Sequence, residues 1–358
     1  MTKSLNLLLF NLATDADDPI LGFTTQWINR LAVHYERIDV VTMRAGRLSV
    51  APNVCVWSVG KEQGYSEVRR LVEFYRSLSR LLRERTYSAC FAHMMPLFAV
   101  MGAPLLRNIP ITLWYTHRQA HRTLQLATLV SHRVVTAAAD SFPLATAKLR
   151  VIGHGIDTEF FSPSEQDAVH HNLIGKPTLI QAARLMPIKH QATLIRALAE
   201  VPDAHAVFVG DVPPGADTAY KTELETLAHE LGAAKRVTFA GNLPPEAVRD
   251  WNRRAAIAVN LSPAGLFDKA ALEGMAVGIP TIVASAAFDD MIGGDPRLRI
   301  PSPEDHAALA DRLRDLLALS EAEQQQIGIR LRERVIAAHG LDGLIARLVS
   351  VLNTGEPA

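Results

Sequence analysis

Hydrophobic and polar positions along the chain form two alternating kinds of segment. Short apolar runs rich in β-branched residues recur throughout and are typical of buried strands. Longer stretches between them have the spacing of amphipathic helices, at 24–35, 67–85, 189–201, 220–232 and 245–255. This alternation predicts parallel sheets with helices on both faces. The predicted strands are LNLLLF, RIDVVTM, VCVWSV, ACFAHM, ITLWYT, RVVTAA and KLRVIG in the first half, and PTLIQAA, HAVFVG, RVTFAG, IAVNLS, PTIVAS and LRIPS in the second.

The pattern indicates two domains rather than one. It restarts near Pro177, after the polar stretch at 162–176, and the 358 residues exceed the usual size of a single compact domain. Two similar α/β domains in tandem, joined around 155–175, explain both observations. A last helical pattern covers 342–352.

Charge is distributed unevenly although the whole chain is neutral. Residues 1–155 contain 18 lysines and arginines against 10 aspartates and glutamates, whereas the remainder contains 19 against 27. A basic half and an acidic half indicate domains with different partners. An anionic membrane surface or an anionic acceptor would suit the basic half. Nucleic acid is not expected, because the sequence has no zinc-finger, aromatic RNA-binding or helix-turn-helix pattern.

Cysteine content and the N-terminal segment indicate a cytoplasmic protein. Cys55 and Cys90 provide neither a disulfide framework nor the spacing of a metal site. The apolar run after Lys3 is followed at once by acidic residues and lacks a small-residue cleavage site, which favours a buried strand over a signal peptide. No stretch resembles a transmembrane helix. Peripheral contact with the inner face of the membrane is a further expectation.

Two loops contain residues that could approach a ligand. Gly22 precedes a predicted helix, where a glycine permits close backbone approach and the helix N-terminus favours an anion. A structural turn would explain the same glycine. The segment VIGHGIDTEFFSP places His154 between two glycines, and Asp157 can cap or turn the chain there. This segment also has the features of a rigid connector.

Cationic side chains directly follow the first strand of the second half. In AARLMPIKH, Arg184 and Lys189 come just after the predicted strand, where ligands bind in open α/β folds. Two cations there suit a diphosphate, because an arginine binds two oxygens at once. Either could instead be an ordinary surface charge. Further along, TFAGNLPPEAV contains Gly241 and a two-proline loop that can hold a flat base against the backbone.

These motifs, in this order, resemble those of the GT-B glycosyltransferases, specifically family 4. From Val151 to Val283, the segments HGIDTEFFSP, ARLMPIKH and FAGNLPPEAV are similar to the family patterns NGVDxxxFxP, GRLxxxKG and FxGxxxxxxV. The resemblance implies an α/β fold of the GT-B type, with two Rossmann-like domains facing across a cleft. It implies an acceptor-binding domain over 1–155, a nucleotide-sugar donor domain over 156–335, and a C-terminal helix over 336–358 that packs back on the first domain.

The resemblance also assigns roles to single residues. Arg184 and Lys189 would contact the donor diphosphate, and Glu273 would accept hydrogen bonds from two ribose hydroxyls. His117, in LWYTHRQAH, matches a histidine that lines the sugar pocket in many members, although it could also pack at a strand end. The predicted catalytic residues are His117, Arg184 and Lys189. The predicted donor-binding residues are Gly22, Arg184, Lys189, Gly241, Asn242, Gly265, Leu266, Phe267, Asp268, Lys269 and Glu273. The acceptor-side candidates are His93 and His154.

One position departs from the common form of the family. Many members carry Glu-x7-Glu, but the residue eight positions before Glu273 is Gly265, so the first glutamate is absent. Asp268 and Lys269 resemble a G-x-x-D-K variant in which these side chains would meet the sugar hydroxyls or the phosphate. Asp268 could instead cap the following helix. The departure bears on donor-sugar identity more than on the fold.

No metal or other cofactor is expected. His117 and His121 have helical i, i+4 spacing, but the sequence offers no third ligand. The acids Asp15 and Asp17 superficially match the metal-binding pair of other glycosyltransferases and are interpreted as loop residues. By resemblance, cationic side chains and helix N-termini neutralise the leaving diphosphate.

Residues 67–85 have both apolar and basic character. Apolar residues at 71, 74/75, 78 and 81/82 stand among six arginines. A surface helix that packs its apolar stripe on the sheet would give this pattern. A basic helix that touches anionic lipid would give it too.

The sequence therefore predicts a retaining glycosyltransferase of the hexosyltransferase class. It would move a sugar from a UDP- or GDP-linked donor to a hydroxyl of a glycan or lipid-linked acceptor, in cell-surface polysaccharide or glycolipid synthesis. A GT-B nucleotide-sugar epimerase or a phosphorylase is an alternative that the motif order disfavours. A non-catalytic nucleotide-sugar-binding protein is another, made plausible by the missing first glutamate. A dinucleotide oxidoreductase is not expected, because neither half has the glycine fingerprint.

Overall fold

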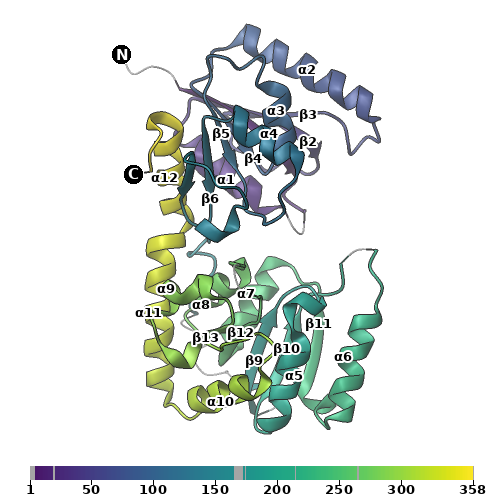
Figure 1. Ribbon diagram of the computed structural model, residues 1–358, viewed down its shortest axis with the longest axis vertical. Helices are drawn as coiled ribbons and strands as arrows, with labels where there is room; N and C mark the ends of the chain where they lie inside the picture. Colours follow the sequence, from purple (N-terminus) through teal and green to yellow (C-terminus); the bar gives the residue numbers. More distant parts are fainter. Residues whose placement is uncertain are drawn as a thin grey trace. The chain divides into compact units, whose positions relative to one another are not determined.

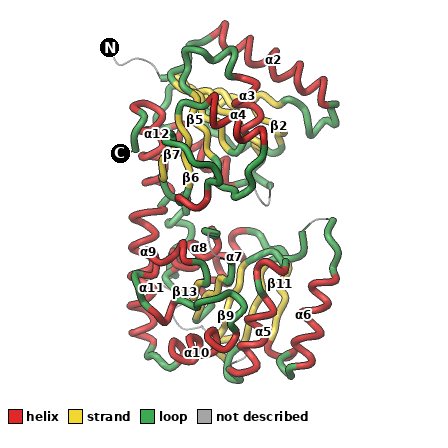
Figure 2. The backbone as a smooth tube through the Cα atoms, in the orientation of Figure 1, coloured by secondary structure: helices red, strands yellow, loops and turns green. Residues whose placement is uncertain are grey.

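The computed structural model describes residues 5–18, 21–164, 172–173, 175–213, 215–263 and 266–357. The chain divides into two compact units, of which the first comprises Met1–Gly155 with Leu341–Ala358 and the second Ile156–Gly340. In each unit, strands lie between helices (Figure 1, Figure 2). The segment 336–358, expected as one C-terminal piece, is divided between the units, because residues 336–340 belong to the second.

The first unit is built on a seven-stranded parallel sheet in the order β3-β2-β1-β4-β5-β6-β7. Its strands are β1 (Asn6–Thr14), β2 (Arg37–Ala45), β3 (Val54–Ser58), β4 (Ala89–His93), β5 (Ile111–Trp114), β6 (Arg133–Thr136) and β7 (Leu149–Val151). Its helices are α1 (Phe23–Ala32), α2 (Glu67–Glu84), α3 (Pro96–Gly102), α4 (Arg122–Val130), the 3-10 turn Ala139–Ser141 and α12 (Leu341–Thr354).

The side-chain alternation of β1 assigns these helices to the two faces of the sheet. Leu7 and Leu9 belong to a core shared with α1 and α12. Leu8 and Phe10 point the other way, into a core shared with α2, α3 and α4. The predicted strands of the first half are all present, and the central strands β1, β4 and β5 are almost wholly buried, as strands covered on both faces are.

The second unit repeats the same strand order on a smaller sheet. The parallel strands run β11-β10-β9-β12-β13, and β8 pairs with β9 in antiparallel fashion. The strands are β8 (Asn172–Leu173), β9 (Lys176–Ala182), β10 (His205–Val209), β11 (Val237–Gly241), β12 (Ile257–Asn260) and β13 (Thr281–Val283). The helices are α5 (Gln191–Glu200), α6 (Ala219–Glu230), α7 (Pro245–Arg254), α8 (Lys269–Val277), α9 (Asp289–Ile292), α10 (His306–Leu317) and α11 (Glu321–His339), with 3-10 turns at Pro187–Lys189, Ala234–Arg236, Ala286–Phe288 and Pro296–Leu298.

The predicted strand LRIPS is wrong. Arg299 forms only an isolated parallel bridge with Val283, and the residues before it make a 3-10 turn. Pro296 precedes this segment and Pro301 lies within it, and a proline cannot donate a backbone N–H to a strand ladder. The apolar residues Leu298 and Ile300 are nevertheless buried, which is what the pattern detected.

None of the helices in the described residues has the length and apolar character that crossing a membrane requires.

Candidate functional site

The centre of the second sheet is the place where its strand order reverses. The chain runs outward from β9 through β10 to β11, then returns to the other side of β9 with β12. Loops at the carboxyl ends of β9 and β12 therefore diverge to opposite faces, which is where ligands bind in open α/β sheets. The β9 loop carries Arg184 and Lys189, and the β12 loop carries Ser262 and Asp268.

Three polar side chains of these two loops and Asn260 at the end of β12 make a single cluster. The Lys189 ammonium lies 2.5 Å from Oδ2 of Asp268 and donates to Oγ of Ser262 at 3.0 Å. Asn260 Nδ2 donates to the same Asp268 oxygen at 3.2 Å, and the Ser262 hydroxyl donates to it as well. Ser262 and Asn260 are buried, while the side chains of Lys189 and Asp268 are 14% and 25% exposed. The cluster thus lies at the rim of the sheet, with its cation within reach of a ligand.

Asp268 is held in its ionised form. Burial by itself opposes ionisation, but Lys189, Ser262 and Asn260 together outweigh it and lower the pKa of the Asp268 carboxyl. Asp268 precedes α8, yet among the described residues its side chain accepts no hydrogen bond from the first turn of that helix. The alternative that Asp268 simply caps α8 is therefore not what the structure shows, because its carboxylate is committed to Lys189.

The β9 loop is fixed by two glutamines that were not among the predicted site residues. Gln181 in β9 donates through Nε2 to the carbonyl of Lys189 at 2.7 Å. Gln191 donates to the carbonyl of Arg184 at 2.9 Å and accepts from the hydroxyl of Tyr220. The Arg184 side chain itself is exposed. The signal for Gln181 was present in TLIQAA, because a glutamine inside a buried strand needs a specific hydrogen-bond partner.

Helix α8 carries a second ion pair. Lys269 and Glu273, four residues apart, approach to 3.1 Å, and the Glu273 side chain is 13% exposed. Leu266 donates its backbone N–H to Pro263, and the Phe267 ring stacks on Phe288 at 4.4 Å between ring centres. Phe267 therefore packs on the core of the unit. Gly265, where the first glutamate of the family pattern is expected, lies outside the described residues.

The loop after β11 is joined to the end of β10. Gly241 has a positive φ of 71° and accepts a hydrogen bond from the Gly210 N–H at 2.8 Å. Asn242 accepts from the Asp211 N–H at 3.1 Å. A Cβ on Gly210 would overlap the carbonyl oxygen of Ala183, so this glycine lets β10 approach the loop that carries Arg184.

The candidates of the first unit lie around the strand reversal of its own sheet, between β1 and β4. Gly22 precedes α1, and a Cβ there would lie 2.7 Å from the Asp18 carbonyl oxygen. His93 pairs in register with Asn11 at the end of β4, is 3% exposed and has its Nδ1 3.3 Å from the Asn11 side-chain oxygen. Phe23 and Trp27 lie among the aromatic rings that enclose it. Burial lowers the pKa of His93 to about 3, so its ring is neutral and closed off from solvent.

The other histidines considered for the site, His117, His121 and His154, lie in loops or at a helix start. His117 is exposed beyond β5 and accepts through Nδ1 from the Gln119 N–H, whereas His121 accepts from Leu124 and caps α4. His154 is half-buried between two glycines of positive φ, and a Cβ on Gly155 would touch the Trp27 ring. No group of three or more metal-ligating side chains occurs within the described part of the chain.

The acids Asp15 and Asp17 organise a loop with Arg47. Asp17 pairs with the Arg47 guanidinium at 2.6 Å, and Asp15 accepts from the backbone N–H groups of Asp17 and Arg47. Their carboxylates thus serve the turn that follows β1.

Residues 164–333 match the family of glycosyl transferases group 1. The chain carries a group 1 glycosyl transferase domain. Arg184, Lys189, Asp268 and Glu273 all fall within these residues, and the predicted resemblance to a glycosyltransferase family is confirmed.

The GT-B fold is confirmed by solved structures. Sucrose-phosphate synthase from Thermosynechococcus elongatus superposes with a TM-score of 0.74 at 19% identity, over 97% of this chain and 98% of that one. HepE from Anabaena, in complex with UDP and glucose, superposes with a TM-score of 0.76 at 17% identity, over 98% and 100% of the two chains. At these identities the similarity establishes the fold alone.

Curated relatives match a smaller part of this chain than the solved structures do. The D-inositol 3-phosphate glycosyltransferase of Mycobacterium sp. (strain JLS) is 34% identical over 156 residues, which is 42% of this chain and 33% of that protein. The enzyme of the same name from Mycolicibacterium smegmatis is 28% identical over 212 residues, 56% of this chain and 47% of that protein. The match therefore spans between a third and a half of the length of these relatives.

Proposed function

We propose that this protein is a retaining glycosyltransferase that transfers a sugar from a nucleotide-sugar donor to a hydroxyl of a glycan or lipid-linked acceptor. The observation that carries the proposal is the position of the Lys189 ammonium, which Asp268 holds at the strand reversal of the domain matched by the glycosyl transferase group 1 family. Arg184 lies in the same loop, and the loop that contains Asp268 leads into α8. Cations and a helix N-terminus at this place match the charge of a nucleoside diphosphate.

The donor would be bound along the carboxyl edge of the second sheet. Lys189, Arg184 and the first turn of α8 would contact the diphosphate. Glu273 would accept hydrogen bonds from the ribose, exchanging its Lys269 partner for two hydroxyls. Gly241 and Asn242 would border the base. UDP or GDP is the proposed nucleotide, and UDP is the one present in the HepE complex.

The proposed reaction breaks the bond between the anomeric carbon and the diphosphate. Negative charge develops on the leaving phosphate, and Lys189 and Arg184 stabilise it as fixed cations. The acceptor oxygen bonds to the anomeric carbon on the same face, and its proton passes to the leaving phosphate oxygen. No protein nucleophile and no metal is required in this scheme. His117 and Gly22 are proposed to line the sugar side and His154 the acceptor side. His93, an acceptor-side candidate from the sequence, is closed off from solvent and is not proposed to touch the acceptor.

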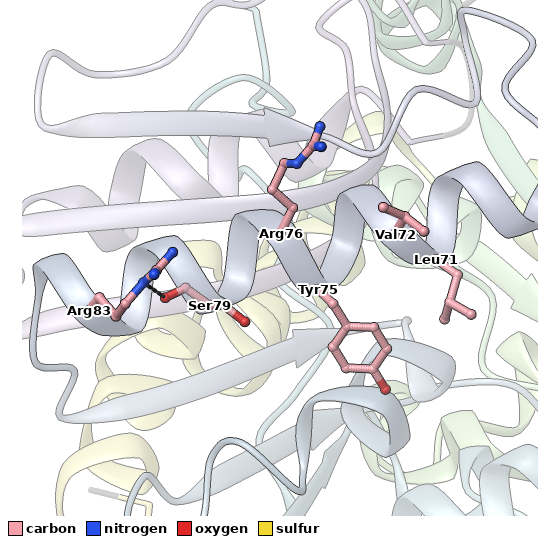
Figure 3. A pocket seen from close by; sticks show the side chains of 6 residues that line it. All are labelled: Leu71, Val72, Tyr75, Arg76, Ser79 and Arg83. Atoms are coloured by element: carbon pink, nitrogen blue, oxygen red, sulfur yellow. Dashed lines mark hydrogen bonds between the residues drawn. The ribbon is translucent and has the colours of Figure 1, made fainter.

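A membrane-associated acceptor is supported by the exposed face of α2. Phe74, Leu78 and Leu81 pack on the core, but Leu71 and Tyr75 are 44% and 36% exposed. The predicted single stripe is thus divided between core and solvent. The exposed part forms a hollow of about 460 Å³, lined by Leu71, Val72, Tyr75, Arg76, Ser79 and Arg83 (Figure 3).

The charge of α2 favours an anionic lipid surface as the occupant of this face. Residues 66–85 contain six arginines and three glutamates. Arg76 pairs with Glu73 and Arg80 with Glu84, which leaves a cationic excess beside exposed apolar side chains. Apolar contact combined with cationic charge is the chemistry of peripheral membrane helices. We propose that the protein acts at the cytoplasmic face of a membrane.

The proposed function is tested by a thermal-shift screen with UDP, GDP, ADP and their sugars, followed by donor hydrolysis. A nucleotide that binds the folded protein should raise its melting temperature, because binding to the native state alone stabilises it. Slow hydrolysis of one nucleotide sugar is the expected second result. Binding without turnover across donors and acceptors would favour a non-catalytic binding protein, and no shift with any nucleotide would overturn the donor site.

A further inference from the structure

Two of the N–H groups of the Lys189 ammonium are already hydrogen-bonded within the protein. An ammonium group carries three N–H donors. One is directed to the Ser262 hydroxyl at 3.0 Å and another to the Asp268 carboxylate at 2.5 Å. No other side chain or carbonyl of the described residues accepts the third, which is available to a ligand at a side chain that is 14% exposed. Lys189 is therefore oriented before any ligand arrives.

The carboxylate that orients Lys189 is itself fixed on the sheet. Oδ2 of Asp268 also accepts from Asn260, the last residue of β12, and from Ser262, two residues beyond it. Both are buried. Two buried donors on a strand end thus hold Asp268, and Asp268 holds the lysine.

From this arrangement we infer that Asp268 is a positioning residue, which fixes the Lys189 ammonium where the leaving phosphate develops its charge. The inference rests on the proposed function. It assigns Asp268 a role that differs from direct contact with the diphosphate, since its Oδ2 accepts from three protein donors and its charge repels a diphosphate. A lysine side chain without this anchor rotates freely about its four-carbon stem.

This role has a kinetic signature of its own. Replacing Asp268 by asparagine removes a negative charge near the diphosphate, so the nucleotide should bind as well as before or more tightly. The released Lys189 would no longer meet the phosphate in the transition state, and the turnover should fall. Misplacement of a catalytic group by about 1 Å can reduce rates by about 100-fold. We expect kcat to fall by about that factor while the donor KM is unchanged or lower.

A double-mutant cycle tests whether Asp268 acts through Lys189. Hydrolysis of UDP-glucose, or of the nucleotide sugar that stabilises the protein most, is measured for wild type, Asp268→Asn, Lys189→Ala and the double variant. If the inference is correct, Asp268→Asn causes no further loss of kcat when Lys189 is already replaced by alanine. An equal loss in both backgrounds, or a raised KM, would show that Asp268 contacts the donor directly and would overturn it.

Controls separate this outcome from a folding defect and from failure of the proposed function. Asp250→Asn removes an aspartate that pairs with Arg249 at 2.9 Å outside the cluster, and should leave kcat and KM unchanged. If Asp268→Asn does not fold, Ser262→Ala should show the same pattern with a smaller loss, and a raised KM there would overturn the inference. A wild-type protein that turns over no nucleotide sugar would overturn the proposed function and this inference together.

Discussion

Gly328 in α11 packs directly against Gly278, the residue that ends α8. A Cβ on Gly328 would overlap the Gly278 carbonyl oxygen, and Gly278 itself has a φ of 90° in the left-handed region. The two helices thus meet backbone to backbone, below the turn that carries Lys269 and Glu273. The end of α8 is held by this contact, and the position of its first turn depends on it.

Gly328→Ala should destabilise the second unit. The added methyl group meets backbone atoms of Gly278 and Ile279 that cannot move aside, and overpacking of this kind costs about 3 kcal/mol in the free energy of unfolding. Thermal and denaturant unfolding measure the effect. Gly343→Ala in α12 is the matched control, because its Cβ would meet only the tip of the Arg347 side chain, and alanine favours helix. Equal melting temperatures for the two variants would contradict this packing.

His93 should make the first unit sensitive to acid. Its pKa is lowered by burial to about 3, whereas an unfolded histidine titrates near 6.5. Below about pH 6.5 the unfolded chain binds a proton that the folded chain refuses, so this contribution to stability is complete above that pH and is lost as the pH falls. The loss amounts to about 1.4 kcal/mol per pH unit down to about pH 3.

Denaturant unfolding at pH 7.5 and pH 5, followed by tryptophan fluorescence, compares wild type with His93→Leu. The variant should lose less stability between the two pH values than wild type does, by about 2 kcal/mol. His34→Leu, at an exposed position, should behave like wild type. An identical pH dependence for the His93 variant would show that this ring is solvated or already protonated in the folded protein.

Lys189→Ala and Glu273→Ala should each weaken use of the donor. The first removes a phosphate cation and the second the proposed acceptor of ribose hydrogen bonds, and loss of a hydrogen bond to a charged group costs about 1.5–3 kcal/mol. Donor kinetics and nucleotide binding by calorimetry measure both changes. Near-normal donor use in both variants would refute the proposed site. Arg314→Ala, whose side chain pairs with Glu200 and Asp311, serves as a control for loss of a cation elsewhere in the same unit.

Binding to anionic vesicles should depend on the exposed face of α2. The wild-type protein should sediment with vesicles of phosphatidylglycerol and phosphatidylcholine at low salt, and less so at high salt, because screening weakens the cationic contribution. The double variant Leu71→Ser, Val72→Ser should lose this binding. Ile329→Ser with Ile336→Ser removes two apolar side chains of similar exposure from α11 in the second unit and should retain it. Failure of the wild type to bind at low salt would remove the membrane from the proposal.

Most of the strand framework could be predicted from the sequence, because parallel strands buried on both faces are nearly continuous apolar runs. The 19-residue helix α11 was not among the predicted elements, although Ser320 and Glu323 form a capping box at its start. Its buried residues Ile327, Leu331 and Val335 are separated by polar and small residues, and the resulting periodicity is weak. The opposite error occurred at 298–302, where apolar residues predicted a strand although prolines stand at 296 and 301.

The site was predicted residue by residue, but its internal contacts were not. Motif order indicated Lys189 and Asp268 separately, each as a ligand of the donor. Their pairing joins positions 79 residues apart, and sequence spacing carries no information about such a contact. Asn260 and Ser262 could have been suspected, since IAVNLS places polar residues at the end of a buried strand. Which group they serve follows only from the folded loops.

The division of the first unit between residues 1–155 and 341–358 has a consequence for synthesis. Leu344, Leu348 and Val351 of α12 complete the core that Trp27 and Leu31 begin. The ribosome therefore synthesises all of 156–340, the whole second unit, before it makes α12, which completes the unit made first. Until then, of the described helices, α1 alone covers that face of the first sheet, and an early stop codon would leave the apolar surface under α12 exposed to chaperones.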